Sequence, residues 1–101
     1  MKLLILLYLE DDDACVTRML SEQGVPVFSR MSVEGIGPGA PGWYGEAAPY
    51  ASRMILALVE PELAEAVLHA VHHGSGLKDS RHPIHAVKLD VEKATACGLP
   101  E

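Results

Sequence analysis

The sequence predicts a single α+β domain whose elements follow the order β-α-β-β-α-β. Continuous or alternating apolar runs, typical of strands, are separated by segments in which apolar residues recur at helical spacing. Length gives a second argument, because 101 residues fill one domain of ordinary size. With 49% hydrophobic and 22% charged residues, the composition is that of a chain that buries a modest core.

The chain begins with a predicted strand over residues 2–9, in which LLILLYL is continuously apolar. Such a run is typical of a strand covered on both faces. Acidic residues follow at 11–13, and we interpret them as helix caps. Asp side chains accept hydrogen bonds from the free backbone N–H groups of a first helical turn and suit the positive end of the helix dipole.

A first helix and a second strand come next. Val16, Met19 and Leu20 repeat at helical spacing, and Gly24 supplies a residue that adopts the left-handed conformation in which many helices end. From Val25 the apolar period changes to two, which predicts a half-exposed strand near an edge of the sheet.

The second half of the chain repeats the strand, helix and strand. MILALVE at 54–60 is another continuous apolar strand, and Pro61 marks the first turn of a helix. We expect this helix to end at Gly74 and a last strand to span residues 84–91. The apolar face of the helix is predicted to consist of Leu63, Ala66, Val67, Ala70 and Val71.

Two split β-α-β units in this order predict a ferredoxin-like sandwich, a four-stranded sheet with two helices on one face. The first and third strands should lie side by side at its centre, because these are the continuously apolar ones. We expect one domain over residues 1–101 with a polar tail at 93–101.

Charge and cysteine content narrow the class of protein. A net charge of −6 argues against nucleic-acid binding, which relies on a basic surface to neutralise phosphates. Cys15 and Cys97 form neither a disulfide framework nor a metal signature, which favours reduced thiols and a cytoplasmic protein. No apolar run approaches the ~18 residues of a membrane span.

The segment VEGIGPGAPGWYGEAAPYAS at 33–52 is unlike the rest of the chain. It holds five glycines, three prolines and three aromatic residues in twenty positions. Loops of this length without internal structure are usually functional or disordered, and aromatic side chains contribute strongly when buried against a partner. The alternative is a structural loop in which Trp43 and Tyr50 fold back over the domain.

The element order, the GIG that ends the second strand, the long loop and a glycine-bearing loop after the second helix together resemble the PII signalling family. The resemblance implies a homotrimer that binds adenine nucleotides in clefts between subunits. It also implies that residues 38–52 signal to a transporter or an enzyme, with Trp43, Tyr44 and Tyr50 contacting that partner. The TELYRGAEY-like context in which family members are modified on tyrosine is not present, so that role is not assigned.

The second loop departs from the family pattern. Where PII proteins have TGxxGDGK, this chain reads HGSGLKDSR at 73–81, which keeps two glycines but loses the motif and its lysine. Glycines still let backbone N–H groups approach a phosphate, and cations neutralise it. We expect ATP, ADP, AMP or another small anionic metabolite to act as effector, with no cofactor required. The predicted ligand-binding residues are Gly35, Gly37, Gly74, Gly76, Lys78, Arg81 and Lys88.

Histidines gather near the end of the second helix. His69 and His73 lie four residues apart, the spacing that brings two side chains to one helix face, and neutral imidazole is a common ligand for Zn, Cu and Ni. They are the candidate metal ligands of an alternative hypothesis, a trimer similar to the CutA proteins that are associated with divalent metals. A structural interpretation is that the helix dipole favours histidine in the last turn.

Catalysis is not indicated. The acidic residues at 11–13 are consecutive and cannot converge as a catalytic pair, and no GxSxG, HExxH or Walker-type motif occurs. We therefore expect a protein that is not an enzyme. A third hypothesis is an interaction module whose loop docks on a protein partner without a small ligand.

Overall fold

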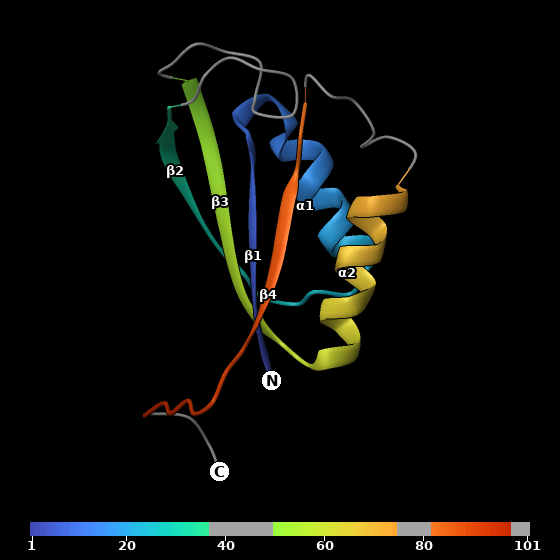
Figure 1. Ribbon diagram of the computed structural model, residues 1–101, viewed down its shortest axis with the longest axis vertical. Helices are drawn as coiled ribbons and strands as arrows, with labels where there is room; N and C mark the ends of the chain where they lie inside the picture. The colour runs from blue at the N-terminus through green and yellow to red at the C-terminus, as the bar shows by residue number, and fades with distance from the viewer. Residues whose placement is uncertain (37–49, 75–81, 98–101) are drawn as a thin grey trace.

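The computed structural model describes residues 1–36, 50–74 and 82–97. These residues form a four-stranded sheet and two α-helices (Figure 1). The elements are β1 (Lys2–Leu9), the 3-10 turn η1 (Glu10–Asp12), α1 (Asp13–Glu22), β2 (Ser29–Gly35), β3 (Tyr50–Val59), α2 (Pro61–His73) and β4 (His85–Asp90).

The strands lie in the order β2-β3-β1-β4, and each neighbouring pair is antiparallel. In the register, Leu6 of β1 lies between Ile55 of β3 and Ala86 of β4. The predicted ferredoxin-like arrangement, with the two most apolar strands adjacent at the centre, is confirmed. The reason is that a central strand is shielded from water along both edges, where apolar residues gain most from burial.

The core lies between the sheet and the helices, which cover one face of the sheet (Figure 1). Alternate residues of the central strands point into it, as the two-residue period of a strand requires. The strands contribute Leu4, Leu6, Tyr8, Ile55, Ala57 and Val59, and the helices contribute Val16, Met19, Leu20, Ala64 and Val67.

The other face of the sheet, here called the open face, is also apolar. Within the described residues no helix covers it, so the prediction that β1 and β3 are buried on both faces is wrong for the single chain. Leu58 is 55% exposed and Leu89 is 48% exposed. By register the open face includes Leu3, Ile5, Leu7, Met31, Met54, Leu56, Leu58, Val87 and Leu89.

Two further expectations need correction. The strand predicted at 54–60 begins at Tyr50, so residues 50–52 of the predicted loop belong to β3, where the buried Ser52 hydroxyl donates to the Tyr8 carbonyl oxygen at 2.7 Å. Helix α2 buries Ala64, which we did not predict, together with Val67. Gly24 has the expected positive φ of 86°, and α2 ends at Gly74 as expected, with φ −64° at that residue.

The acidic residues 10–13, here called the acidic turn, do not cap α1 through their side chains. Neither η1 nor α1 has a side-chain hydrogen bond from its N-cap residue, so the capping interpretation is wrong. The described helices are too short and too polar to cross a membrane.

Candidate functional site

The two glycine-bearing connections leave the described fold at the same end of the sheet. The first departs after Ile36 and returns at Tyr50, and the second departs after Gly74 and returns at His82. Because the strands are antiparallel, this is also where β1 ends in the acidic turn (Figure 1). We call it the loop end.

Gly35 and Tyr50 form the last paired position of β2 and β3, directly below the first connection. The ring of Tyr50 lies against Gly35 so closely that a Cβ atom added to Gly35 would stand 1.9 Å from Tyr50 Cε2. Gly35 is therefore required for a close approach. A side chain here would have to displace an aromatic ring that marks the base of the loop.

A shallow groove of about 360 Å³ lies beside this contact. Its lining residues come from the last part of β2 and the first part of β3. They are Ser32, Val33, Glu34, Tyr50 and Ala51. The groove thus places Tyr50, which the sequence assigned to a partner surface, next to Gly35, which it assigned to ligand binding.

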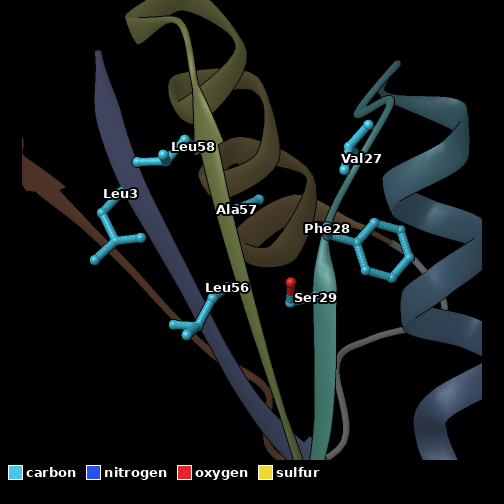
Figure 2. A pocket seen from close by; sticks show the side chains of 7 residues that line it. All are labelled: Leu3, Val27, Phe28, Ser29, Leu56, Ala57 and Leu58. Atoms are coloured by element: carbon cyan, nitrogen blue, oxygen red, sulfur yellow. The ribbon is translucent and has the colours of Figure 1, made fainter. Parts of the chain in front are cut away.

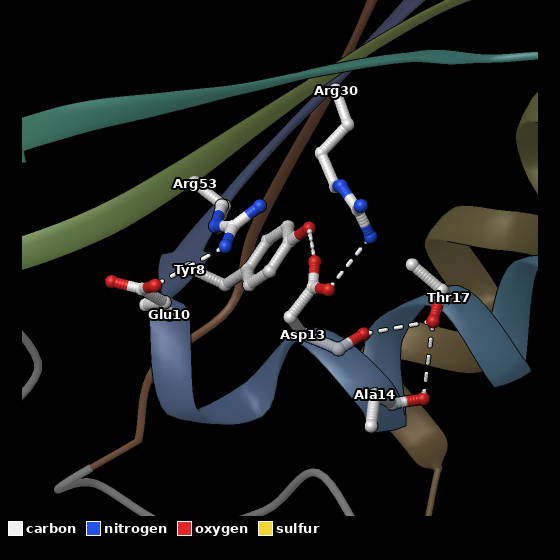
Figure 3. Close-up of polar contacts among 7 residues, drawn as sticks. All are labelled: Tyr8, Glu10, Asp13, Ala14, Thr17, Arg30 and Arg53. Atoms are coloured by element: carbon white, nitrogen blue, oxygen red, sulfur yellow. Dashed lines mark hydrogen bonds and ion pairs between the residues drawn. The ribbon is translucent and has the colours of Figure 1, made fainter.

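The acidic turn forms a polar network just beneath the loop end (Figure 3). Asp13 accepts a hydrogen bond from the Tyr8 hydroxyl at 2.7 Å and pairs through its other oxygen with Arg30 of β2, also at 2.7 Å. Burial raises the pKa of Tyr8, and its hydrogen bond to Asp13 raises it further. The Tyr8 hydroxyl is therefore a firmly protonated donor.

Two neighbouring carboxylates extend the network to other segments. Glu10 pairs with Arg53 of β3 at 3.1 Å (Figure 3), and Asp12 lies 3.2 Å from Nδ1 of His82, which follows the second connection. Arg53 Nε is buried and finds no hydrogen-bond partner within the described residues. The acidic residues therefore contact β2, β3 and the segment that leads into β4, at the base of both connections.

Sequence reasoning missed this network. Arg30 and Arg53 both fall on the helix-facing side of a strand, where an arginine needs an acidic partner, and the acidic turn is the nearest such group. That combination is a signal the sequence carries, but the identity of the partners depends on the register of β2 with β3.

Lys88 lies on β4, and its ammonium group pairs with Glu65 of α2. In the order β2-β3-β1-β4, Lys88 and Gly35 occupy opposite edge strands. With strands about 4.8 Å apart, three strand spacings separate those edges by roughly 14 Å. Within one chain, then, these two predicted ligand-binding residues do not meet.

The remaining candidates divide between the described residues and the rest of the chain. Gly74 ends α2, and its N–H donates to the Ala70 carbonyl oxygen at 2.7 Å. His69 and His73 have ring centroids 4.4 Å apart on α2. Outside the described residues lie Gly37, Trp43, Tyr44, Gly76, Lys78 and Arg81.

A groove at the opposite end of the sheet does not suit an anion. It has a volume of about 430 Å³ and forms where residues 25–28 diverge from β3, because pairing of β2 with β3 begins at Ser29 and Leu56 (Figure 2). None of its lining residues is charged. They are Leu3, Val27, Phe28, Ser29, Leu56, Ala57 and Leu58.

No protein-family model matches the chain, and no curated protein matches it by sequence. Solved structures do match. CPII, a nitrogen regulatory PII-like protein from Thiomonas intermedia bound to ADP, AMP and bicarbonate, is 19% identical with a TM-score of 0.61, over 93% of this chain and 94% of that one. The apo form of CPII is also 19% identical with a TM-score of 0.59, over 87% and 89%.

A PII-like protein from Thermus thermophilus is 13% identical with a TM-score of 0.65, over 89% of this chain and 85% of that one. At these identities the likeness concerns the fold. The chain thus has the fold of the PII-like proteins along most of its length, as the resemblance implied.

Proposed function

We propose that this protein is a homotrimeric PII-like regulator that binds an adenine nucleotide or another small anionic metabolite between neighbouring subunits. The observation that supports this most strongly is the match of almost the whole chain to CPII, which was solved with ADP, AMP and bicarbonate. The connection that includes residues 38–49, with Tyr50 at its base, then signals the bound state to a membrane transporter or an enzyme, and the protein itself is not an enzyme.

The open face supports self-association. It presents side chains such as Leu58 and Val87, 55% and 45% exposed, on strands whose residues on that side are mostly apolar. An exposed apolar patch of this kind marks an interaction surface, since its burial stabilises an assembly by about 25 cal/mol per Å². Three copies that turn their open faces inward would complete the covering of β1 and β3.

A cyclic trimer would also bring together Gly35 and Lys88, which lie on opposite edges of the sheet within one chain. In a ring each subunit uses two different surfaces, so one edge of a sheet faces the opposite edge of its neighbour. Gly35 and Gly37 of one subunit would then face the segment 74–88 of the next, with Gly74, Gly76, Lys78, Arg81 and Lys88. An anion that reaches Lys88 competes with Glu65 for the ammonium group.

The contact of Gly35 with Tyr50 supports a route from the ligand to the loop. A ligand held at Gly35 touches the backbone on which the Tyr50 ring rests, at the base of residues 38–52. A ligand shifts a conformational equilibrium by its differential affinity for the two states, so a contact made in one loop arrangement alone changes its population. Trp43, Tyr44 and Tyr50 are the proposed partner contacts.

Calorimetry with ATP, ADP, AMP and bicarbonate tests the ligand. We expect at least one of them to bind, and we expect Lys88→Ala to weaken binding by at least about tenfold, since a charge-assisted hydrogen bond contributes about 1.5–3 kcal/mol. Lys93→Ala, which removes the same charge from the exposed tail, should leave affinity unchanged. If none of the four binds at millimolar concentration, the ligand-binding proposal is refuted. The hypothesis that remains is an interaction module whose loop docks on a protein partner without a small ligand.

A further inference from the structure

The last two turns of α2 carry three exposed histidines, His69, His72 and His73. The rings of His69 and His73 are in contact, with centroids 4.4 Å apart and planes inclined by 40°. The ring of His72 meets that of His73 edge-on, with centroids 4.5 Å apart. The proposed regulator uses none of these side chains.

The geometry of His69 and His73 fits two ligands of one metal ion. Zn–N bonds of about 2.0–2.1 Å at a tetrahedral angle place the two nitrogens roughly 3.3 Å apart. The two rings lie with centroids 4.4 Å apart, so one ion comes within reach of a nitrogen from each once both side chains adjust their torsions. Residues at i and i+4 share one helix face, so the helix itself holds the pair together.

The charge around the pair favours a cation. The helix ends at Gly74, directly after His73, and the carbonyl groups of a last turn carry the negative end of the dipole. The chain as a whole has a net charge of −6. Glu65 lies one turn before His69 on the same row of the helix and adds a negative field, although Lys88 occupies its carboxylate.

The donor set also defines the class of ion. Among the described residues no group of three or more His, Cys, Asp or Glu side chains is arranged to hold a metal. The site is therefore a two-imidazole chelate with its other positions filled by water. Imidazole suits Cu, Ni and Zn, whereas Mg prefers oxygen ligands, and affinity should follow the order of divalent ions in which copper is highest.

We propose that His69 and His73 form a surface site for a divalent transition ion such as Cu²⁺, Ni²⁺ or Zn²⁺. The site lies on the solvent side of α2 and uses none of the side chains proposed for the anion, although Gly74 of that site directly follows His73. Its occupation raises the stability of the folded chain by mass action, because the unfolded chain does not hold the two rings together.

Calorimetry of the full chain with NiCl₂, CuCl₂, ZnCl₂ and MgCl₂ tests the proposal. We expect one transition ion per chain, tightest for Cu²⁺, and no heat from Mg²⁺. His69→Ala and His73→Ala should each weaken Ni²⁺ binding at least tenfold. His72→Ala is the matched control, since it removes an imidazole from the same turn, and it should change affinity less than threefold.

Far-UV circular dichroism confirms that each variant keeps its helix content, which is expected because all three side chains are exposed. The proposal is overturned if His69→Ala binds Ni²⁺ like the parent chain, if His72→Ala weakens binding as strongly as His69→Ala, or if no transition ion binds. Titration of ATP into His69→Ala tests the proposed anion site independently of the metal site, because the anion site does not include His69.

Discussion

Replacing Asp13 with alanine tests whether the acidic turn holds the loop end together. In the native chain Asp13 accepts the Tyr8 hydroxyl at 2.7 Å and pairs with Arg30 at 2.7 Å (Figure 3). Asp13→Ala leaves the hydroxyl of a fully buried tyrosine without its acceptor, which costs about 1–3 kcal/mol. The ion pair adds only about 0–1 kcal/mol, because the Arg30 side chain is 43% exposed.

The two contributions give an expected loss of about 1–4 kcal/mol in the free energy of unfolding. For a domain of this size each kcal/mol corresponds to a fall in Tm of about 4–8 °C. Arg30→Ala should cost less than about 1 kcal/mol. Tyr8→Phe leaves one oxygen of the Asp13 carboxylate without its donor, but that side chain is 21% exposed and can reach water, so the cost should be about 0.5–1.5 kcal/mol.

Urea unfolding at one fixed protein concentration measures these changes, since self-association makes stability depend on concentration. A double-mutant cycle of Asp13→Ala with Tyr8→Phe should give a coupling energy of about 1–2 kcal/mol. The reasoning is refuted if Asp13→Ala destabilises the chain no more than Arg30→Ala does, or if the coupling energy is zero. Either result would mean that the buried hydroxyl does not depend on Asp13.

Three further predictions concern the base of the loop, the open face and pH. Gly35→Ala should destabilise the fold by about 1–3 kcal/mol through its clash with the Tyr50 ring, and adding Tyr50→Ala should recover most of that loss in urea unfolding. In analytical ultracentrifugation, Leu58→Glu should sediment as a monomer that keeps the circular dichroism spectrum of the parent chain. Ser21→Glu on α1 is the control and should leave the assembly intact. A parent chain that already sediments as a monomer would refute the proposed trimer. The raised pKa of Tyr8 means that the folded state holds the phenolic proton more tightly than the unfolded state, so this contribution is complete below about pH 10 and is lost as pH rises further. The free energy of unfolding should therefore fall more steeply above pH 10 in the parent chain than in Tyr8→Phe, and equal slopes would show that Tyr8 does not titrate differently in the two states.

The elements and their order were predictable from the sequence, because hydrophobic periodicity is a local property. A continuous apolar run such as residues 2–9 or 54–60 predicts a strand, and Gly24 predicts a helix end, independently of the rest of the chain. The central place of β1 and β3 followed from the same runs. Gly35 was predicted from the sequence as a ligand-binding residue, whereas its close contact with the Tyr50 ring could not be predicted from local patterns.

The acidic turn shows where local patterns fail. Asp12 and Asp13 were interpreted as helix caps, yet they pair with His82 and Arg30, which lie 70 and 17 residues away. Glu10 beside them pairs with Arg53, 43 residues away. Similarly, Tyr50 was assigned to the loop, because no local signal says that β3 pairs with β2 as far as Gly35.

By itself, then, the amino-acid order determined which segments become strands and helices and which residues are chemically able to bind an anion or a metal. Tertiary structure alone decided which of them meet. The antiparallel register brings the acidic turn, the two arginines and the Gly35–Tyr50 contact to one end of the sheet, and it leaves Gly35 and Lys88 on opposite edges. The physical reason is that periodicity reports only on neighbours a few residues away, whereas pairing across a sheet depends on how all four strands share one core.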